Sequence, residues 1–306
     1  MNMRVHSLLE HKLVNLALPG AEELALRREQ PPDRLIGQIL RESKSLTEVQ
    51  FDQILAYQTK HHVRFGEAAI ALRLASPPEV LWALSQQFHC PYSAASGLSA
   101  ELVAAVDPFG SQAEAIRGIR SELMIAARAG DQPKRPLAVL SPDGGDGKSY
   151  LAANLAISYS QLGASTVIID ADMRTPRQHQ LFSISNESGL SGILSGRAQP
   201  NVILTIADLP NLFVLPVGTL PPNPLDLLQR PAFEELLQYL LTKFDHIIVD
   251  APAAVHGADA LVIAAKCDLA LVIARRGRTQ MKAVHALLGQ VTRSGTRVAG
   301  VVINDH

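Results

Sequence analysis

A glycine-rich segment between an apolar strand and a helix constrains the fold of this chain more than any other feature. The apolar run 137–140 leads into Ser-Pro-Asp-Gly-Gly-Asp-Gly-Lys-Ser (141–149), and a helical pattern follows from Tyr150. A phosphate-binding loop requires this order of strand, loop and helix. Its glycines let successive backbone N–H groups converge on phosphate oxygens, and the helix N-terminus adds a partial positive charge. The sequence therefore predicts an α/β fold with a phosphate site at this turn.

The residues of this loop have distinct expected roles. Lys148 supplies a mobile cation for the outer phosphates of a nucleotide, and the Ser149 hydroxyl is placed to ligate Mg²⁺. The full pattern has a glycine where this chain has Pro142. The other residues expected to contact the nucleotide are Gly144, Gly145, Asp146, Gly147 and Tyr150.

Two further apolar strands end in aspartate. Thr166–Asp170 is followed closely by Asp172 and Arg174, and His246–Asp250 forms the second such run. The carboxyl ends of parallel strands converge on one edge of an open sheet, which is where ligands bind. We therefore expect these carboxylates to meet the phosphate-binding loop. Asp172 has an alternative role, because the second aspartate of such a pair can cap the following turn.

These three motifs together resemble the Walker A, A′ and B motifs of bacterial tyrosine kinases (BY-kinases). Three other segments fit that family, namely 114–123, 189–196 and 216–228. The resemblance runs from about Pro108 to the C-terminus. It is strongest to EpsG-type kinases, which pair with a membrane chain-length determinant in exopolysaccharide export. The wider relatives are ParA/MinD-type ATPases, whose signature lysine would fall at Asp143; its absence favours the kinase branch.

The resemblance implies a P-loop NTPase with a mostly parallel sheet flanked by helices. Its expected activity is Mg²⁺- and ATP-dependent phosphorylation of protein tyrosine, autokinase-like, in the regulation of exopolysaccharide chain length and export. Asp172 would orient or deprotonate the tyrosine hydroxyl. Arg174 would either stabilise charge or hold the strand edge, and Asn304 falls where relatives contact adenine. Three oxygen ligands would organise Mg²⁺, with Asp250 acting directly or through water: Ser149, Asp170 and Asp250.

The string Glu114, Arg117 and Arg120 has two interpretations. Ser111–Glu114 reads as a helix-capping box, with the two arginines on one solvated helical face. In the BY-kinase family a string of this spacing mediates ring assembly, and arginine forks suit pairing with carboxylates between subunits. We favour the second interpretation and expect a homo-oligomer. The basic run Arg275–Arg278 is expected to be a solvated loop.

The N-terminal third contains an internal repeat. Gly37 and Gly66, like Thr47 and Ser76, are 29 positions apart. Each copy reads as a short helix, a turn and a longer helix that begins at a capping box. The pattern resembles the N-terminal domain of type II secretion ATPases, in which Arg-Leu-Gly-x-x-Leu repeats bind cyclic di-GMP. The first copy has Leu35 where that arginine belongs, so we expect protein docking and no tight cyclic di-GMP binding.

These patterns divide the chain into four regions. They are an extension (1–29), a small all-helical repeat domain (30–95), a linker (96–111) and the P-loop BY-kinase-like domain (112–306).

Composition limits the compartment and the partners. The net charge of −1 gives no electrostatic case for nucleic-acid binding. Cys90 and Cys267 are too few for a disulfide framework or a zinc site, which favours a reducing compartment. We expect no signal peptide and no membrane span. The expected location is therefore cytoplasmic, peripheral at the inner membrane through the chain-length determinant protein.

One departure from the family pattern leaves the activity open at this point. The family usually ends in a tyrosine cluster, whereas this chain ends in Asn304-Asp305-His306 and has five tyrosines, none adjacent to another. The acceptor is then a non-clustered tyrosine or another protein. The alternatives are an ATP-gated regulator of the export complex, similar to ParA/MinD switches, and a regulator that responds to cyclic di-GMP.

Overall fold

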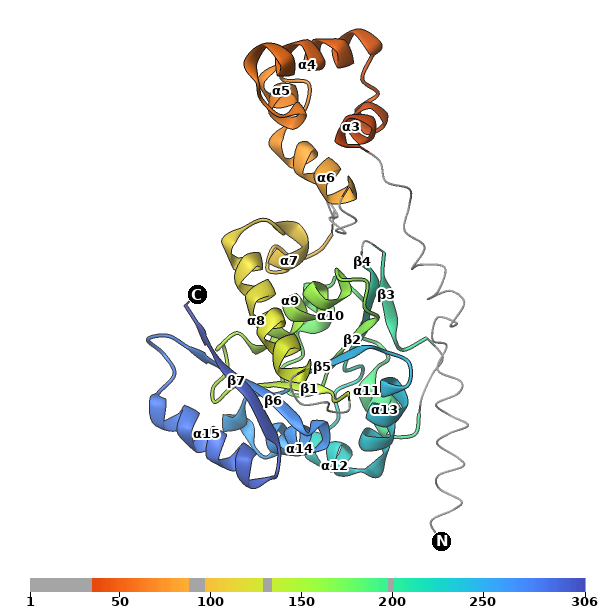
Figure 1. The fold of residues 1–306 in the computed structure, drawn as a ribbon. Coiled ribbons are helices and arrows are strands. Elements are labelled where there is room, and N and C mark those ends of the chain that lie inside the picture. Colours follow the sequence, from red (N-terminus) through yellow and green to blue (C-terminus); the bar gives the residue numbers. More distant parts are fainter. Residues whose placement is uncertain (1–34, 88–96, 129–133, 198–200, 208, 306) are drawn as a thin grey trace.

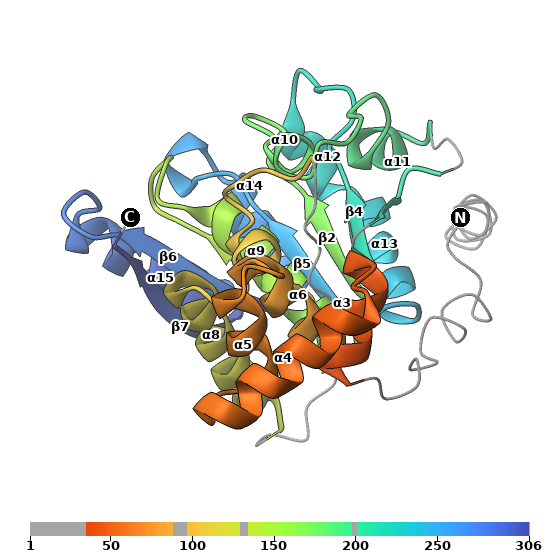
Figure 2. The ribbon, with the colours of Figure 1, turned by 90° about the horizontal axis from the view of Figure 1, so that it is seen from above.

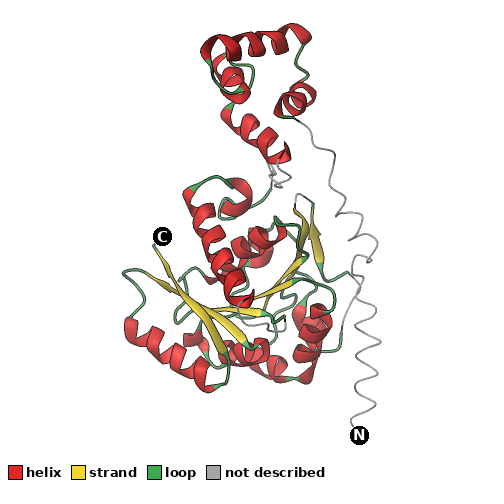
Figure 3. Ribbon diagram, in the orientation of Figure 1, coloured by secondary structure: helices red, strands yellow, loops and turns green. Residues whose placement is uncertain are grey.

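The structure, a computed structural model, describes residues 35–87, 97–128, 134–197, 201–207 and 209–305. The expected extension (1–29) lies outside these residues, as do Cys90 and Tyr92. The described chain forms a small helical unit and a larger unit built on a β-sheet (Figure 1). The strands of the described residues all belong to the second unit (Figure 3).

A seven-stranded sheet forms the centre of the larger unit. Its strand order is β3-β4-β2-β5-β1-β6-β7. Neighbouring strands are parallel except β3 and β4, which are antiparallel. This confirms the mostly parallel sheet that the motifs predicted. The strands are β1 (Leu137–Leu140), β2 (Thr166–Asp170), β3 (Leu204–Ile206), β4 (Leu209–Leu215), β5 (His246–Asp250), β6 (Leu269–Arg275) and β7 (Arg297–Asn304).

Helices cover both faces of the sheet (Figures 1 and 2). One face carries α7 (Val103–Val106), α8 (Ser111–Arg128), α9 (Lys148–Ser160) and α10 (Gln178–Leu181). The other carries α11 (Leu190–Leu194), α12 (Pro224–Gln229), α13 (Pro231–Leu241), α14 (Asp259–Cys267) and α15 (Met281–Arg293). A short 3₁₀ turn, η1 (Ala254–His256), follows β5.

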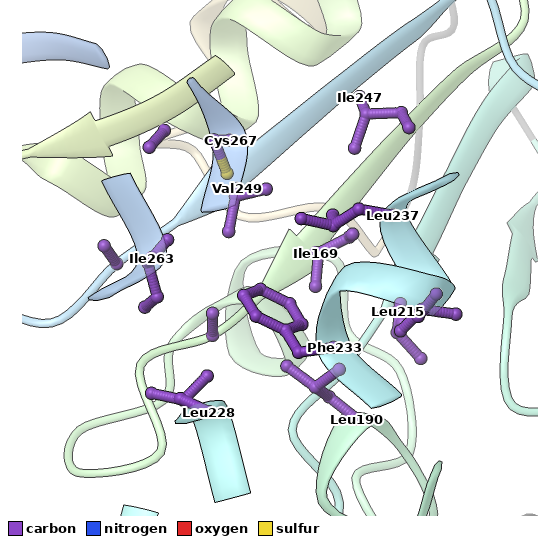
Figure 4. Packing of buried hydrophobic residues seen from close by; sticks show 14 of the residues in the cluster. Ile169, Leu190, Leu215, Leu228, Phe233, Leu237, Ile247, Val249, Ile263 and Cys267 are labelled. Carbon is purple, nitrogen blue, oxygen red and sulfur yellow. The ribbon is translucent and has the colours of Figure 1, made fainter. Parts of the chain in front are cut away.

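The central strands are buried on both faces because each face has its own apolar core. Alternate residues of a strand point to opposite faces, so Ala138 packs in one core and Val139 in the other. Phe233 of α13 lies among Ile169 and Leu190 in the first core (Figure 4). This two-sided burial explains why the strands read as nearly continuous apolar runs.

Helix α9 is buried along nearly its whole length. The buried side chain of Asn154 accepts a hydrogen bond from the Ala104 N–H (2.9 Å) and donates one to the Glu101 carbonyl (2.9 Å). Leu102 is fully buried in the same core. The region 96–111, expected to be a linker, is therefore packed against the sheet unit from about Leu98 onward. An alanine- and serine-rich composition does not distinguish a flexible linker from a segment that fits closely against a helix.

The helical unit confirms the internal repeat as a structural one. A short helix precedes a longer one twice: α3 (Ile36–Lys44) and α4 (Glu48–His61), then α5 (Phe65–Ala71) and α6 (Pro77–Gln87). Thr47 and Gln50 form the predicted capping box, and Glu79 accepts a hydrogen bond from the Ser76 N–H (2.8 Å). At Gly66 a Cβ would fall 2.5 Å from Val80 Cγ1, so a larger residue there would displace the Val80 side chain.

Among the helices of the described segments, none combines the length and the apolar character needed to cross a bilayer.

Candidate nucleotide-binding site

The predicted phosphate-binding loop joins β1 to α9, which begins at Lys148. Gly145 (φ 81°) and Gly147 (φ 103°) adopt the left-handed conformation that favours glycine. The buried side chain of Asp146 accepts a hydrogen bond from the Asp143 N–H (3.0 Å) and another from the Thr279 hydroxyl (2.8 Å). The Asp146 side chain therefore stabilises the conformation of the loop and connects it to Thr279.

The ends of β6 and β7 support the same loop from outside. Asn304 Nδ2 donates a hydrogen bond to the Asp146 carbonyl (3.0 Å), and Arg275 Nη1 donates one to the Gly145 carbonyl (3.3 Å). The Arg278 guanidinium also lies against the loop, since a Cβ placed on Gly145 would fall 2.7 Å from its Nη1. The basic run was expected to be a solvated loop, and Arg276 and Arg278 are indeed exposed, but Arg275 and Arg278 also lie against the phosphate-binding loop. Strand pairing, which sequence spacing does not reveal, brings these two arginines to the phosphate site.

The acidic strand ends meet beside this loop, as predicted. Strands β2 and β5 are parallel neighbours, and Asp170 lies in register with Asp250. Strand β1, which leads into the loop, pairs with β5 on its other side. The carboxylates of Asp170, Asp172 and Asp250 are all buried, with exposures of 0%, 2% and 0%. Three acidic groups thus share one water-poor edge of the sheet.

Asp170 and Asp172 each accept several hydrogen bonds. Asp170 accepts from the backbone N–H groups of Asp172 (3.2 Å), Arg177 (3.1 Å) and Gln178 (3.0 Å). Asp172 accepts from the N–H groups of Arg174 (3.1 Å) and Thr175 (2.9 Å) and from the Thr175 hydroxyl (2.9 Å). Asp172 therefore does cap the following turn, which was its alternative role.

Arg174 is held by a carboxylate that the sequence analysis did not single out. Its Nε donates to Asp259 Oδ2 at 2.5 Å, and the Asp259 side chain is 1% exposed. Asp259 begins α14, so the pair ties the turn after β2 to that helix. This geometry favours the second of the two roles considered for Arg174, holding the strand edge. No local pattern links the two residues, which are 85 positions apart.

Burial and repulsion between neighbouring carboxylates raise the pKa values of Asp170 and Asp250. Burial raises the pKa of Asp170 well above its usual value, and the charge of Asp250 raises it further. Burial also raises the pKa of Asp250, to about 6, against the opposing effects of Lys148, Gln178 and Ser149. Carboxylates in this state favour a cation at the site, because its charge would offset both burial and repulsion.

Gln178 is a site residue that the sequence analysis missed. It is fully buried, and its Nε2 donates to Asp250 Oδ2 (2.7 Å) and to the Ser149 carbonyl (3.2 Å). A glutamine eight residues after an aspartate has no recognisable pattern, so no local signal identified it. Gln178 lies on helix α10, which places its side chain within hydrogen-bond distance of Ser149 and Asp250.

The oxygen groups at this edge fit Mg²⁺. Asp250 Oδ1 is buried and has no hydrogen-bond partner, and the Ser149 hydroxyl lies near enough to the Asp250 carboxylate to lower its pKa. Within the described ranges no cluster of three or more His, Cys, Asp or Glu side chains is arranged to hold a metal ion. Mg²⁺ at phosphate sites takes one or two carboxylates, with water and the phosphates completing its shell. A hydroxyl and one or two carboxylates beside a phosphate loop match that requirement.

The expected assembly string lies on α8 and is partly engaged within the chain. Arg117 pairs with Glu114 (2.5 Å) and donates to the Pro108 carbonyl (2.5 Å). Arg120 donates to the Ser158 carbonyl of α9 (2.6 Å). The Glu114 side chain remains 72% exposed. The two arginines of this string therefore bond within the chain, while Glu114 remains largely exposed to solvent.

Comparisons with known proteins agree with this geometry. The family described as "ParA: NUBPL iron-transfer P-loop NTPase" matches residues 132–305. The putative tyrosine-protein kinase CapB of Staphylococcus aureus is 34% identical over 200 residues, which cover 64% of this chain and 86% of CapB. The chain spans only about a quarter of the length of the longer curated tyrosine-protein kinases that it matches.

Solved structures give the same result. The chimerical protein CapA2B2 superposes with a TM-score of 0.63 at 30% identity, covering 72% of this chain and 96% of that one. The kinase domain of Escherichia coli tyrosine kinase ETK gives a TM-score of 0.65 at 29% identity, covering 69% and 81%. The helical repeat precedes the region that the ParA family matches.

Proposed function

The chain belongs to the bacterial tyrosine kinases, within the ParA-like P-loop NTPases, and we propose that it phosphorylates protein tyrosine with Mg²⁺-ATP. The observation that carries this proposal is the meeting of Asp170 and Asp250, in register, beside the Lys148–Ser149 loop. A P-loop NTPase fold binds a nucleotide with Mg²⁺ in general; ATP as the donor and tyrosine as the acceptor are the proposed particulars.

Each residue has a role that follows from its position. Lys148 and the N–H groups of Gly144, Gly145 and Gly147 would hold the β- and γ-phosphates. Ser149 and Asp250 would bind Mg²⁺, and Asp170 would complete the acidic edge that attracts it. When bound, Mg²⁺ would neutralise the charge that develops on the phosphate oxygens.

Transfer would form a bond from the tyrosine oxygen to the γ-phosphorus and break the bond from that phosphorus to the bridging oxygen of ADP. The hydroxyl proton would pass to a carboxylate, for which Asp172 is the candidate. Its Oδ2 has a single hydrogen bond, from the Thr175 hydroxyl, and a hydroxyl donor can rotate to admit a substrate. Arg174 would keep Asp172 in place through its bond to Asp259 rather than touch the phosphate.

The acceptor is proposed to lie on another protein. Within the described residues, four tyrosine side chains are buried or half-buried: Tyr57, Tyr150, Tyr159 and Tyr239. We further propose a membrane chain-length determinant of exopolysaccharide export as the partner, and a location at the inner membrane through it. This extends the BY-kinase resemblance and the similarity to CapB and CapA2B2.

An ATP-gated regulator without kinase activity is the second candidate. The observation in its favour is that Asp172 caps its turn with three hydrogen bonds, a structural role that needs no substrate. In that case nucleotide hydrolysis would change partner binding, and no tyrosine would be modified.

Purified protein and γ-labelled ATP distinguish the two candidates, with and without the cytoplasmic tail of the partner. Label on tyrosine supports the kinase, whereas free phosphate alone supports the regulator. Lys148→Met should abolish both signals. Asp172→Asn keeps an oxygen to cap the turn, so it should lower transfer to tyrosine by about 100-fold or more and preserve nucleotide affinity. Normal transfer by Asp172→Asn would remove Asp172 from the mechanism.

A further inference from the structure

Gln178 connects three elements of the nucleotide site. Its Nε2 donates to Asp250 Oδ2 at the end of β5 (2.7 Å) and to the Ser149 carbonyl in the first turn of α9 (3.2 Å). Its own N–H donates to Asp170 Oδ2 at the end of β2 (3.0 Å). A single residue therefore joins both acidic strand ends to the phosphate-binding helix.

Two buried oxygen atoms beside these contacts have no partner. Gln178 Oε1 and Asp250 Oδ1 are both inaccessible to solvent and accept no hydrogen bond. The two side chains are bonded to each other through their other polar atoms. A buried acceptor without a partner costs about 1–3 kcal/mol. Two such acceptors, on side chains that are bonded to each other, mark this part of the site as one that can accept a donor or a cation.

An amide suits this position better than a carboxylate would. Asp170, Asp172 and Asp250 already place three acidic groups in a buried region. A fourth negative charge would add repulsion in a medium that screens it poorly. The neutral amide instead offers a donor to Asp250 Oδ2 and keeps a carbonyl oxygen for a further bond.

We propose that Gln178 is a positioning residue for Mg²⁺. Its Nε2 holds Asp250 Oδ2, which leaves Oδ1 directed to the cation or to one of its waters, and Gln178 Oε1 accepts a hydrogen bond from a metal-bound water. Residues that orient a metal ligand in this way commonly change metal affinity by 10–100-fold when they are replaced. The inference rests on the Mg²⁺–nucleotide site of the proposed function and not on transfer to tyrosine.

The test measures the Mg²⁺ concentration that gives half-maximal binding of a fluorescent ADP analogue to the full chain. Gln178→Met has a similar volume and no amide, and Gln178→Asn keeps an amide that is one methylene shorter. Gln180→Leu is the matched control, because Gln180 is exposed on the same short helix. We expect Gln178→Met to raise the required Mg²⁺ by about 10–100-fold and Gln178→Asn by a smaller factor. Binding of the analogue in EDTA should stay as in wild type.

The inference would be overturned if the Mg²⁺ concentration that Gln178→Asn requires were within two-fold of that required by the Gln180→Leu control. The same result for Gln178→Met would also overturn it. Equal losses with Mg²⁺ and with EDTA would also overturn it, because they indicate a damaged loop. If Gln178→Met does not fold, as judged by circular dichroism, Gln178→Asn decides. Wild type that binds the analogue with Mg²⁺ but labels no tyrosine would refute the kinase proposal and leave this inference intact.

Discussion

Replacing Asp250 by asparagine should stabilise the nucleotide-free protein while it weakens the use of Mg²⁺. The Asp250 carboxyl is fully buried, and burial raises its pKa to about 6 from a usual value of 3.8. The folded protein therefore binds a proton that the unfolded chain releases between these two pH values. Its free energy of unfolding falls as the pH rises through this interval and is constant above it.

The size of the effect follows from the pKa difference. A shift of about two pKa units corresponds to about 3 kcal/mol of folding free energy lost above pH 6. An asparagine has no charge to bury, and its oxygen can still accept the hydrogen bond from Gln178 Nε2. Asp250→Asn should thus match wild type near pH 4 and be more stable by up to about 3 kcal/mol at pH 8. For a domain of this size that corresponds to a melting temperature higher by about 6–12 °C.

Thermal unfolding in EDTA, followed by far-UV circular dichroism from pH 4 to pH 8, checks this prediction. Trp82 lies in the helical unit, so its fluorescence reports on that unit separately. Asp245→Asn is the matched control. Burial alone would raise the pKa of Asp245, but its hydrogen bonds to Lys134 and Ser165 outweigh burial and lower it. Its contribution to stability is therefore present at neutral pH and lost in acid, so Asp245→Asn should destabilise the protein at pH 8.

A result in which Asp250→Asn is less stable than wild type at pH 8 would refute the reasoning. A difference between the two proteins that does not change with pH would do the same, since a constant offset reports packing and not ionisation. The accompanying loss of Mg²⁺-dependent nucleotide binding separates function from stability at this carboxylate.

Three further predictions concern the other features of the chain. Arg278→Ala should weaken ATP binding about ten-fold, because the Arg278 guanidinium lies against the phosphate-binding loop. The control Arg276→Ala removes only an exposed pair with Asp305 and should leave the affinity unchanged, so equal ATP affinities of the two variants in a fluorescence titration would contradict this. Replacing Arg117 and Arg120 together by alanine should convert a nucleotide-loaded oligomer into monomers, measured by light scattering, and an unchanged size distribution would limit the two residues to their contacts within the chain. Cyclic di-GMP should give no saturable sub-micromolar signal in calorimetry of the full chain, because Leu35 precedes α3 at the position that Arg64 occupies before α5. A sub-micromolar signal that is lost in Arg64→Ala would refute the docking interpretation.

The sequence by itself determined the architecture and the place of the site. Parallel strands share a direction, so aspartates at the ends of Thr166–Asp170 and His246–Asp250 meet at the edge that carries the Gly-Lys-Ser loop. Capping boxes and a repeat of fixed length likewise determined the helical unit, because both act over a few residues. Such features are local or follow from strand direction, and the sequence pattern contains both.

Only the tertiary structure decided which side chains act together. Gln178 under the loop, Asp259 on Arg174 and Arg278 against Gly145 come from contacts between residues far apart in the chain. The close packing of residues 98–107 and the capping bonds of Asp172 likewise depend on exact positions. Amides, single arginines and small residues have no diagnostic spacing, and their role is set by burial and by the neighbour that each one meets. The pKa of Asp250 is the clearest case, because burial sets it and the sequence does not record burial.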